Sequence, residues 1–465
     1  MHKDIKLFSE LCHILLEEES KCPVAKPINT SELYDVLDLS LNEDPMLDEA
    51  YKTTLIDIIK STPKTASKSF FNQLFGGRIG KSTLGDLMAV MFNNSMYTYK
   101  VAGPQVGIEK IVLKNICELA GYDTSASDGT FAPGGSMSNM MAMIMARDYK
   151  NTKIRSEGIT HKMIAYTSDV SHYSISKNAA LTGLGKDQVR HVKTNDKGEM
   201  LAEDLERLIN EDINNGYEPF FINATAGTTV LGAFDDLEAI SQVSKKYNLW
   251  LHVDGAYCGG VIFSDKYKHL VKGLEHSDSF SVNAHKMLGT PLSCSIIITQ
   301  RKAQLHHSFS NEADYLYQTD TDDYNLGKIS MQCGRRNDAL KLWTLWKSVG
   351  TKGLKKIVDH QFALADTART YIKDHSDYEL FSNDESISVC FNYKGIPAST
   401  LCTALYENSE LMVGFGNFRG KEFVRLVTIN TVVDHTDILA FFKKLEAYVA
   451  EDEELSRYSE PVKIC

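Results

Sequence analysis

Between about residues 100 and 300, short apolar runs alternate with helical patterns, and this alternation limits the possible folds more than any other feature of the sequence. "KMIAYTS" (162–168), "EPFFINAT" (218–225) and "LWLHVDGAY" (249–257) are such runs, and "DDLEAISQVSKKYN" (235–248) is the helical stretch between the last two. Strands that are apolar almost throughout and alternate with helices are typical of a mostly parallel sheet buried on both faces. The sequence therefore predicts an α/β fold with a mostly parallel central sheet.

Past about residue 345 the pattern changes, which predicts a second, smaller domain. We expect a long helix over 355–375, then alternating strand-like pieces, and a last helix from about residue 434. The first 20 residues are typical of an amphipathic helix. Because 465 residues are too many for one simple core, we expect three parts. These are an N-terminal helical segment at 1–60, a large domain at 61–345 and a small C-terminal α+β domain at 346–465.

The composition argues against several kinds of partner and site. A formal net charge of −11 without a Lys/Arg block argues against nucleic acid, which needs a basic face. The sequence has no run of 18 apolar residues, so we expect no membrane span. Nine cysteines without a C-x-x-C pair predict free thiols instead of disulfides or a zinc site. The His306–His307 pair has no third ligand nearby, so we expect no metal, and a charged N-terminus unlike a signal peptide predicts a cytoplasmic location.

Four polar features are expected at the carboxyl ends of the predicted strands, where open α/β sheets bind ligands. The first is the pair Gly134–Gly135, directly before a Met/Ala-rich helix that begins near Ser136. Glycines let the backbone approach a ligand closely, and the unpaired N–H groups of a first helical turn bind phosphate. A plain helix start capped by a serine would give the same pattern.

The second and third features are Asp254 and His172. Asp254 follows an apolar run, where a carboxylate is costly to desolvate unless a cation pairs with it. Its role is either structural or that of a carboxylate which keeps a ring nitrogen protonated. His172 lies just past a strand and opens a helix. A structural hydrogen bond is the simpler role for such a histidine, and a contact with a ligand is the other.

The fourth feature is Lys286, which follows a buried run and stands beside His285 and near Asn283. A lysine that is partly desolvated near other cations has a lowered pKa and becomes a nucleophilic amine, suited to a Schiff base with an aldehyde. A phosphate cradle, a carboxylate for a ring nitrogen, a histidine and a Schiff-base lysine together describe a site for pyridoxal 5′-phosphate. None of the four features is decisive singly.

Seven motifs, spread in order over roughly residues 70 to 430, support this site. They are "FFNQLFGG" (70–77), "GTFAPGGSMSN" (129–139), "SHYSISKNAALTGLG" (171–185), "NATAGTTVLGAFDD" (223–236), "WLHVDGAY" (250–257), "NAHKMLG" (283–289) and "QCGRRNDALKLW" (332–343). Through these motifs the chain resembles the group II pyridoxal-phosphate-dependent amino acid decarboxylases, in the branch of glutamate, cysteine sulfinate and aspartate decarboxylases.

The resemblance implies a fold type I enzyme, usually a homodimer, with the amphipathic N-terminal helix in the dimer contact. It implies that Lys286 forms the Schiff base, that Asp254 pairs with the pyridine nitrogen and that His172 stacks on the ring. The residues that the resemblance implies for phosphate binding are Ser136 and Met137 through their backbone N–H groups, and Thr229, Asn283 and His285 through their side chains.

The chain departs from the family pattern at two places. Ala284 stands where the family usually has a proline, and we expect little consequence. The loop before "QCGRR" is about three residues shorter than the family's, and the family places there a tyrosine that helps to protonate the product carbon. Tyr324 is the nearest candidate for this catalytic role. If the shorter loop does not supply this proton donor, some oxidative deamination or abortive transamination would accompany decarboxylation.

Three residues are expected to select the substrate. Arg425, in "EFVRLVTIN", aligns with an arginine that the family uses for a substrate carboxylate, although a surface salt bridge is the alternative role. Gln73 lies where the family's acidic-substrate enzymes contact the distal carboxylate. Phe75 resembles the cysteine sulfinate type, and its bulky ring would shorten the pocket. We therefore expect decarboxylation of a small acidic L-amino acid, with cysteine sulfinate or aspartate favoured and glutamate next.

Other functions stay open at this point. One alternative is a decarboxylase of aromatic amino acids, and another is a protein derived from decarboxylases that only binds the cofactor. A nicotinamide-dependent oxidoreductase would share the α/β pattern, but it needs a glycine fingerprint straight after an early strand, which the sequence lacks.

Overall fold

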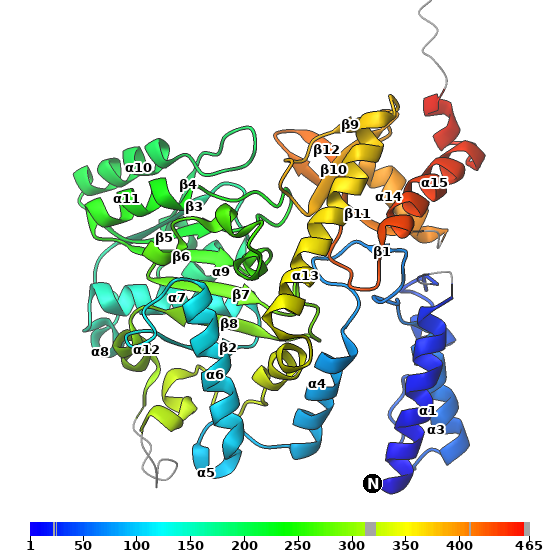
Figure 1. Ribbon diagram of the computed structural model, residues 1–465, viewed down its shortest axis with the longest axis horizontal. Helices are drawn as coiled ribbons and strands as arrows, with labels where there is room; N and C mark the ends of the chain where they lie inside the picture. The colour runs from blue at the N-terminus through cyan, green and yellow to red at the C-terminus, as the bar shows by residue number, and fades with distance from the viewer. Residues whose placement is uncertain (22–23, 25, 312–321, 409–410, 460–465) are drawn as a thin grey trace, which may run out of the picture. The chain divides into compact units, whose positions relative to one another are not determined.

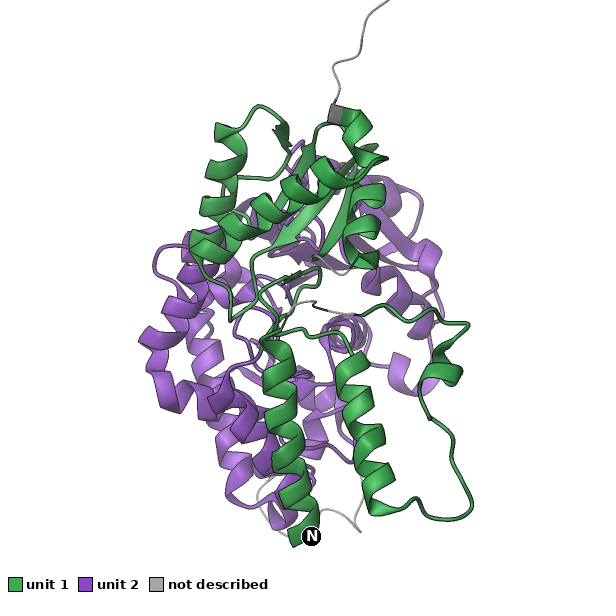
Figure 2. Ribbon diagram, turned by 90° about the vertical axis from the view of Figure 1, so that its right-hand side faces the viewer, with its two compact units in different colours: residues 1–77, 363–465 green, residues 78–362 purple. Residues whose placement is uncertain are grey.

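The structure, a computed structural model, describes residues 1–21, 24, 26–311, 322–408 and 411–459. The chain divides into two compact units, of which unit 1 comprises residues 1–77 and 363–465 and unit 2 comprises residues 78–362 (Figure 2). The sequence predicted boundaries near residues 60 and 345. The two units change at 77/78 and 362/363, and residues 1–77 belong to the same unit as residues 363–465. The three-part division stays a prediction.

Unit 2 contains a seven-stranded sheet in the order β2-β8-β7-β6-β5-β3-β4 (Figure 1). The pairs β3–β4, β3–β5, β5–β6 and β6–β7 are parallel, whereas β8 runs antiparallel to β7 and β2. The predicted mostly parallel sheet of an α/β fold is therefore confirmed. Its strands are β2 Asp128–Ala132, β3 Met163–Ser168, β4 Val189–Val192, β5 Glu218–Thr225, β6 Trp250–Gly255, β7 Ser279–Asn283 and β8 Ser295–Thr299.

Helices cover this sheet on both faces. Every residue of β3, β6 and β7 is buried, which requires cover on both sides. Helix α7 packs against β2, β5, β6, β7 and β8, and α10 and α11 pack against β5. The helices that begin in this unit are α4 Gly80–Phe92, α5 Tyr99–Ala102, α6 Pro104–Leu119, α7 Gly135–Lys150, α8 Ile154–Glu157, α9 Ser174–Leu181, α10 Ala202–Asn214, α11 Leu237–Tyr247, α12 Lys302–Phe309 and α13 Ala339–Asp374, which is interrupted at Gly350.

Unit 1 contains a five-stranded sheet in the order β1-β11-β12-β10-β9. Only the short β1 is parallel to its neighbour, and the other described pairs are antiparallel, as expected for an α+β domain. The α15 helix begins with a capping box between Asp434 and Asp437. The elements are α1 His2–Glu19, α2 Leu33–Val36, α3 Asp48–Ser61, β1 Phe70–Phe71, β9 Tyr378–Leu380, β10 Ser388–Tyr393, α14 Ala398–Glu407, β11 Met412–Phe418, β12 Lys421–Val427 and α15 His435–Glu451.

Short 3₁₀ turns complete the secondary structure, at η1 Lys186–Gln188, η2 Gly259–Phe263, η3 Lys268–Val271, η4 Leu274–His276, η5 Asp322–Tyr324, η6 Leu326–Ile329 and η7 Leu455–Ser459. Among the described residues, no helix combines the length and apolar character that a membrane span requires.

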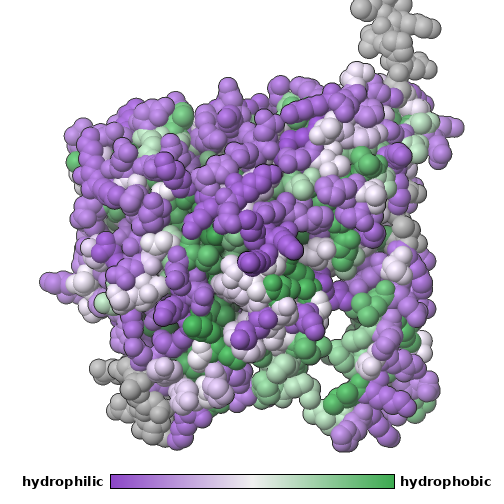
Figure 3. All heavy atoms as spheres, viewed as in Figure 1, coloured by the Kyte–Doolittle hydropathy of each residue, from purple (hydrophilic) through white to green (hydrophobic). Residues whose placement is uncertain are grey.

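The α4 helix leaves much of its apolar surface in contact with solvent. Only Ser82, Gly85 and Ala89 are buried in this helix. Its exposed apolar side chains form what we call the α4 face, and apolar residues gather on the surface in this region in Figure 3. The residues of the α4 face are Leu84, Leu87, Met88, Val90, Met91 and Phe92.

Candidate active site

A cavity of about 160 Å³ lies in unit 2 at the edge of the large sheet where five strands end. Because β8 is antiparallel to both of its neighbours, β2 runs in the same direction as β7, β6, β5 and β3. The loops after these five strands therefore meet at one edge, where α/β sheets bind ligands. The cavity is lined by Gly135, Ser136, Asn139, His172, Thr225, Gly227, Thr229, Asp254, Ala256, Tyr257, Asn283, His285 and Lys286.

One end of the cavity is formed by the start of α7. Gly134 has a φ of 128°, which favours glycine, and α7 begins at Gly135. A Cβ atom on Gly135 would lie 2.9 Å from Asn283 Nδ2 and 3.1 Å from Ala256 Cβ, so glycine is needed for this close approach. The first-turn N–H groups and the small residues around them fit a phosphate group.

Asp254 lies at the carboxyl end of β6 and is only 5% exposed. Its Oδ2 accepts a hydrogen bond from Asn139 Nδ2 (2.7 Å), and its Oδ1 accepts one from the backbone N–H of Ala256 (3.0 Å). Two N–H donors stabilise a buried carboxylate in its charged form. Such a carboxylate can hold a proton on a ring nitrogen.

The two histidines of the cavity are held neutral by their surroundings. Burial lowers the pKa of His172, whose Nδ1 accepts a hydrogen bond from the Ser174 backbone N–H (3.2 Å). Burial and then the charge of Lys286 lower the pKa of His285 to about 4. Its Nδ1 accepts from the backbone N–H of Cys294 (2.9 Å). A neutral imidazole can lie flat against an aromatic ring or donate one N–H to an anion.

Lys286 brings its amine to the same cavity. It is half-buried in the turn after β7, and its Nζ lies 6.0 Å from the centroid of the Tyr257 ring. Thr225 is paired with Asp254 across β5 and β6, and its Oγ1 is buried and has no hydrogen-bond partner among the described residues. A lysine amine, a glycine cradle and a buried hydroxyl without a partner fit pyridoxal phosphate, an aldehyde with a phosphate and a polar ring.

The cavity contains four functional candidates that the sequence did not single out: Asn139, Thr225, Gly227 and Tyr257. The spacing of Asn139 could have identified it, because it lies three residues after Ser136 and so on the same face of α7. Thr225 is the last residue of β5, a position at which ligand contacts were expected for the other strands. Gly227 and Tyr257 follow strand ends in the same way.

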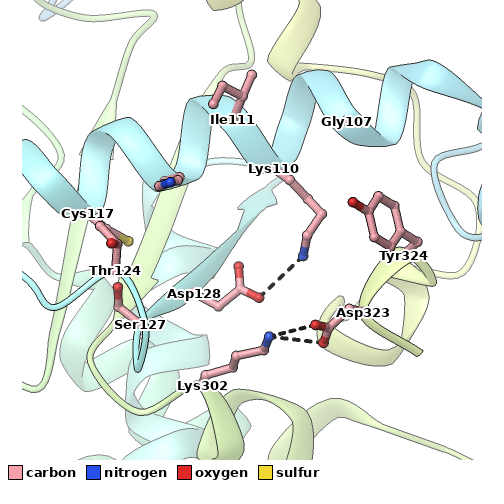
Figure 4. Close-up of a pocket in the computed structure, with 11 residues that line it drawn as sticks. Gly107, Lys110, Ile111, Cys117, Thr124, Ser127, Asp128, Lys302, Asp323 and Tyr324 are labelled. Atoms are coloured by element: carbon pink, nitrogen blue, oxygen red, sulfur yellow. Dashed lines mark hydrogen bonds and ion pairs between the residues drawn. The ribbon is translucent and has the colours of Figure 1, made fainter. Parts of the chain in front are cut away.

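The structure does not bring Met137 or Tyr324 to this cavity. The backbone N–H of Met137 donates to Gly134 O (3.0 Å), so it is already used within the helix start. Tyr324 lines another cavity of about 330 Å³, where the centroid of its ring lies 5.7 Å from Lys110 Nζ (Figure 4). Its ring also meets that of Tyr99 edge-on. The loop before it, residues 312–321, lies outside the described residues. The roles of Met137 and Tyr324 therefore stay predictions.

The three residues expected to select the substrate belong to unit 1. Arg425 on β12 is half-buried, and its Nη2 donates to the backbone O of Asn72 (3.0 Å). Gln73, the next residue, is exposed, and Phe75 is half-buried with its ring centroid 6.4 Å from that of Phe70. One hydrogen bond thus joins the β12 arginine to the segment that carries Gln73 and Phe75.

Comparison with known proteins identifies the family. Residues 31–394 match the pyridoxal-dependent decarboxylase conserved domain. The chain is 37% identical over 453 residues to a cysteine sulfinic acid decarboxylase from rat (Rattus norvegicus), which covers 92% of this chain and 91% of the rat protein. It is 40% identical over 367 residues to the human (Homo sapiens) protein of that name, over 77% of this chain and 74% of the human one.

A solved structure agrees with these relatives. The crystal structure of mouse CSAD superposes with a TM-score of 0.91 at 34% identity, covering 96% of this chain and 98% of the mouse chain. Fold, site and sequence agree with a carboxy-lyase of fold type I that uses pyridoxal phosphate. The chain belongs to the pyridoxal-dependent decarboxylase family.

Proposed function

We propose that the protein removes the α-carboxylate of a small acidic L-amino acid as CO₂, and that L-cysteine sulfinate or L-aspartate is preferred over L-glutamate. The observation that carries this proposal is the 37% identity, over nine-tenths of both chains, to a rat protein named cysteine sulfinic acid decarboxylase. The resemblance of Phe75 to the cysteine sulfinate type supports it, because a bulky side chain at the substrate would favour a shorter acid.

In this proposal the cavity of unit 2 holds the cofactor by its two ends. The Ser136 N–H and the side chains of Thr229, Asn283 and His285 bind the phosphate, and Lys286 offers its amine to the aldehyde carbon. His172 covers one face of the ring. When bound, pyridoxal phosphate supplies an electron sink for the electron pair left on the α-carbon as CO₂ departs. Asp254, whose carboxylate is held in place by two N–H donors, would pair with the protonated ring nitrogen.

The side chains of unit 1 supply the recognition of an acid. The guanidinium of Arg425 offers paired N–H donors that match a carboxylate or a sulfinate, and the Gln73 amide adds a further donor. We propose that these two residues bind the side-chain acid of the substrate.

Tyr324 keeps its proposed role as proton donor to the product carbon, and Tyr324→Phe should then raise the ratio of aldehyde to amine product.

The test is CO₂ release by purified protein loaded with pyridoxal phosphate. The panel is L-cysteine sulfinate, L-aspartate, L-glutamate and one aromatic amino acid, with each amine product identified. Preferred turnover of cysteine sulfinate or aspartate supports the proposal. Turnover of the aromatic substrate alone contradicts the substrate assignment, and cofactor binding without any CO₂ release contradicts decarboxylation.

We also propose that the protein is a cytoplasmic homodimer. The α4 face supports a dimer, because six apolar side chains of one helix lie exposed in a single chain. The α1 helix supports it as well, since it has no buried residue and exposes Ile5, Phe8 and Leu16. Light scattering of wild type and of Met91→Lys, with Lys81→Met as the control on the same helix, tests the dimer: we expect Met91→Lys to shift it toward monomer.

A further inference from the structure

A chain of buried hydrogen bonds in unit 2 ends on the Asp254 carboxylate. Trp250 Nε1 donates to Ser279 Oγ (2.9 Å), and His252 Nδ1 lies 2.9 Å from the same oxygen. His252 Nε2 lies 3.1 Å from Asn139 Oδ1, and Asn139 Nδ2 donates to Asp254 Oδ2 (2.7 Å). None of these five residues is more than 5% exposed, so solvent does not compete for the bonds.

The side chains of this hydrogen-bonded series come from three elements, β6, β7 and α7. Trp250, His252 and Asp254 alternate along β6, so their side chains lie on one face of the sheet. Ser279 is paired with His252 on the neighbouring strand β7. Asn139 comes from α7, which packs against β6 and β7 and inserts its amide between the histidine and the aspartate.

The donor and acceptor groups allow only one direction of donation along this series of hydrogen bonds. A carboxylate only accepts, so the Asn139 amide turns its NH₂ group to Asp254 and its oxygen to His252. Burial lowers the pKa of His252 to about 4, so near neutral pH the ring carries one proton, on the nitrogen that faces Asn139. His252 Nδ1 then accepts from the Ser279 hydroxyl, which itself accepts from the indole N–H of Trp250. An indole N–H can only donate, so both ends of the chain require the same direction.

The amide of Asn139 has no other way to turn. Its second N–H donates to Ser174 Oγ (3.1 Å), and Ser281 Oγ donates to its oxygen (3.3 Å). The other charged and titratable groups that act here are His172 and Lys286. Burial is the largest cause that lowers the pKa of His172; the charge of Asp254 opposes this shift and the charge of Lys286 adds to it. A flipped amide would put its oxygen against the carboxylate.

We propose that Asn139 and His252 are positioning residues, which fix the orientation of the Asp254 carboxylate toward the ring nitrogen of the cofactor. The inference rests on the proposed role of Asp254. Neither residue takes part in bond breaking. If the Asn139 donor is lost, one of the two hydrogen bonds that hold the carboxylate is gone, and its interaction with a protonated ring nitrogen weakens.

The experiment compares variants of the cofactor-loaded protein. Asn139→Leu removes the amide, and Asn139→Asp keeps its shape but opposes Asp254 with a second carboxylate. His252→Leu removes the ring, and His252→Gln keeps an N–H that can reach Asn139. The matched control is Asn223→Leu, which removes a buried asparagine of β5 whose amide donates to Thr167 (3.0 Å) outside the chain of bonds.

Three readouts are measured on each variant: loss of cofactor on dilution, the pH midpoint of the absorbance change of the bound cofactor, and kcat and KM. For both Asn139 variants we expect cofactor binding to weaken by roughly 10- to 100-fold, the cost of one lost bond to a buried charge. We also expect the midpoint to move to higher pH and kcat to fall more than KM rises. His252→Leu should weaken cofactor binding and lower kcat, and His252→Gln should stay close to the wild type in both.

The control separates a positioning role from a structural one. Asn223→Leu should lower thermal stability and leave the pH midpoint of the cofactor unchanged. The inference is overturned if both Asn139 variants keep the affinity and the midpoint of the wild type, or if Asn223→Leu moves the midpoint equally. Should Asn139→Leu not fold, Asn139→Asp and the two His252 variants decide the question. If the wild type binds cofactor without releasing CO₂, the proposed function is refuted, but cofactor affinity and the pH midpoint can still be compared among the variants.

Discussion

At the level of single side chains, the proposed choice among acidic substrates depends on Phe75. In the proposed function its ring limits the length of the acid, so Phe75→Ser should raise the preference for glutamate over cysteine sulfinate, by roughly 10-fold in the ratio of kcat/KM values. Competition between the two substrates measures this ratio directly. Phe415→Ser, at an exposed phenylalanine of the same unit, is the control. An unchanged ratio in Phe75→Ser would contradict this role.

Arg425 carries the second prediction at this scale. Arg425→Gln removes a charged, paired donor, so KM for the acidic substrate should rise by roughly 10- to 100-fold while cofactor binding stays as in the wild type. Initial rates and cofactor absorbance measure the two effects. Arg419→Gln changes an exposed arginine between β11 and β12 and should leave KM unaltered. Loss of cofactor in Arg425→Gln would instead indicate a structural role.

Functional residues could be predicted from the sequence where a charged side chain, which costs free energy to bury, stands in an apolar run. Asp254 and Lys286 were found in this way, because an isolated charge after a buried strand requires an explanation. Asn139 was not found, since a polar residue within a helix looks the same whether it faces solvent or a buried carboxylate. Its significance comes from α7 lying on β6, which is a tertiary contact.

At the level of elements, a buried ion pair ties α6 to the "QCGRR" segment. Arg335 Nη1 and Nη2 donate to the two carboxylate oxygens of Glu109 (2.8 and 2.6 Å), and both side chains are almost fully buried. Glu109→Gln leaves the guanidinium without its counter-charge, so the free energy of unfolding should fall by about 3 kcal/mol or more. Urea unfolding measures it. Arg336→Gln, where the side chain is 49% exposed, should cost less than about 1 kcal/mol.

Strands and helices were predictable where periodicity and length agree. The run 218–225 is β5 to the residue, and 162–168 differs from β3 by one position. The long helix expected over 355–375 begins earlier, at Ala339, and is interrupted at Gly350. The order of the seven strands could not be predicted, because sequential strands need not be neighbours: β2 pairs with β8, about 165 residues later.

At the level of the whole molecule, two buried histidines make stability depend on pH. The pKa values of His252 and His285 are each lowered to about 4, against about 6.5 in an unfolded chain. Between these values the unfolded chain binds a proton at each histidine and the folded chain does not. Stability therefore falls as pH is lowered from about 6.5 to about 4 and levels off below.

The buried carboxyl of Asp235 opposes this trend. Burial raises the pKa of Asp235 to about 7, so between pH 4 and 7 the folded chain holds a proton that the unfolded chain has lost. The stabilisation from this group is therefore lost as pH rises from about 4 to 7. For His252, His285 and Asp235 together, the unfolded chain binds about one proton more than the folded chain, or about 1.4 kcal/mol per pH unit between pH 6 and 4.5. The lowered pKa of His172 and the raised pKa of Asp338 act in opposite directions. Urea unfolding at several pH values tests this, with His252→Gln expected to flatten the slope. Stability that is constant or higher at pH 4.5 would contradict the prediction.

The division into units was beyond what the sequence could predict. β1 has two residues, and it pairs with β11 through Phe70 and Met412, about 340 residues apart. A pattern of two apolar residues contains no information about so distant a partner, so the boundary at residue 60 had no support from periodicity. The large sheet, in contrast, was predictable because β3 and β5 are mostly apolar runs of six and eight residues that alternate with helical patterns.

The most direct test of the account is borohydride reduction of the protein loaded with pyridoxal phosphate, followed by peptide mapping. Borohydride fixes the cofactor to the amine with which it forms a Schiff base. The account predicts one modified peptide, the one that contains Lys286, and no modification at that site in Lys286→Ala. A modification at another lysine, or one spread over many lysines, would contradict the assignment of this cavity as the active site.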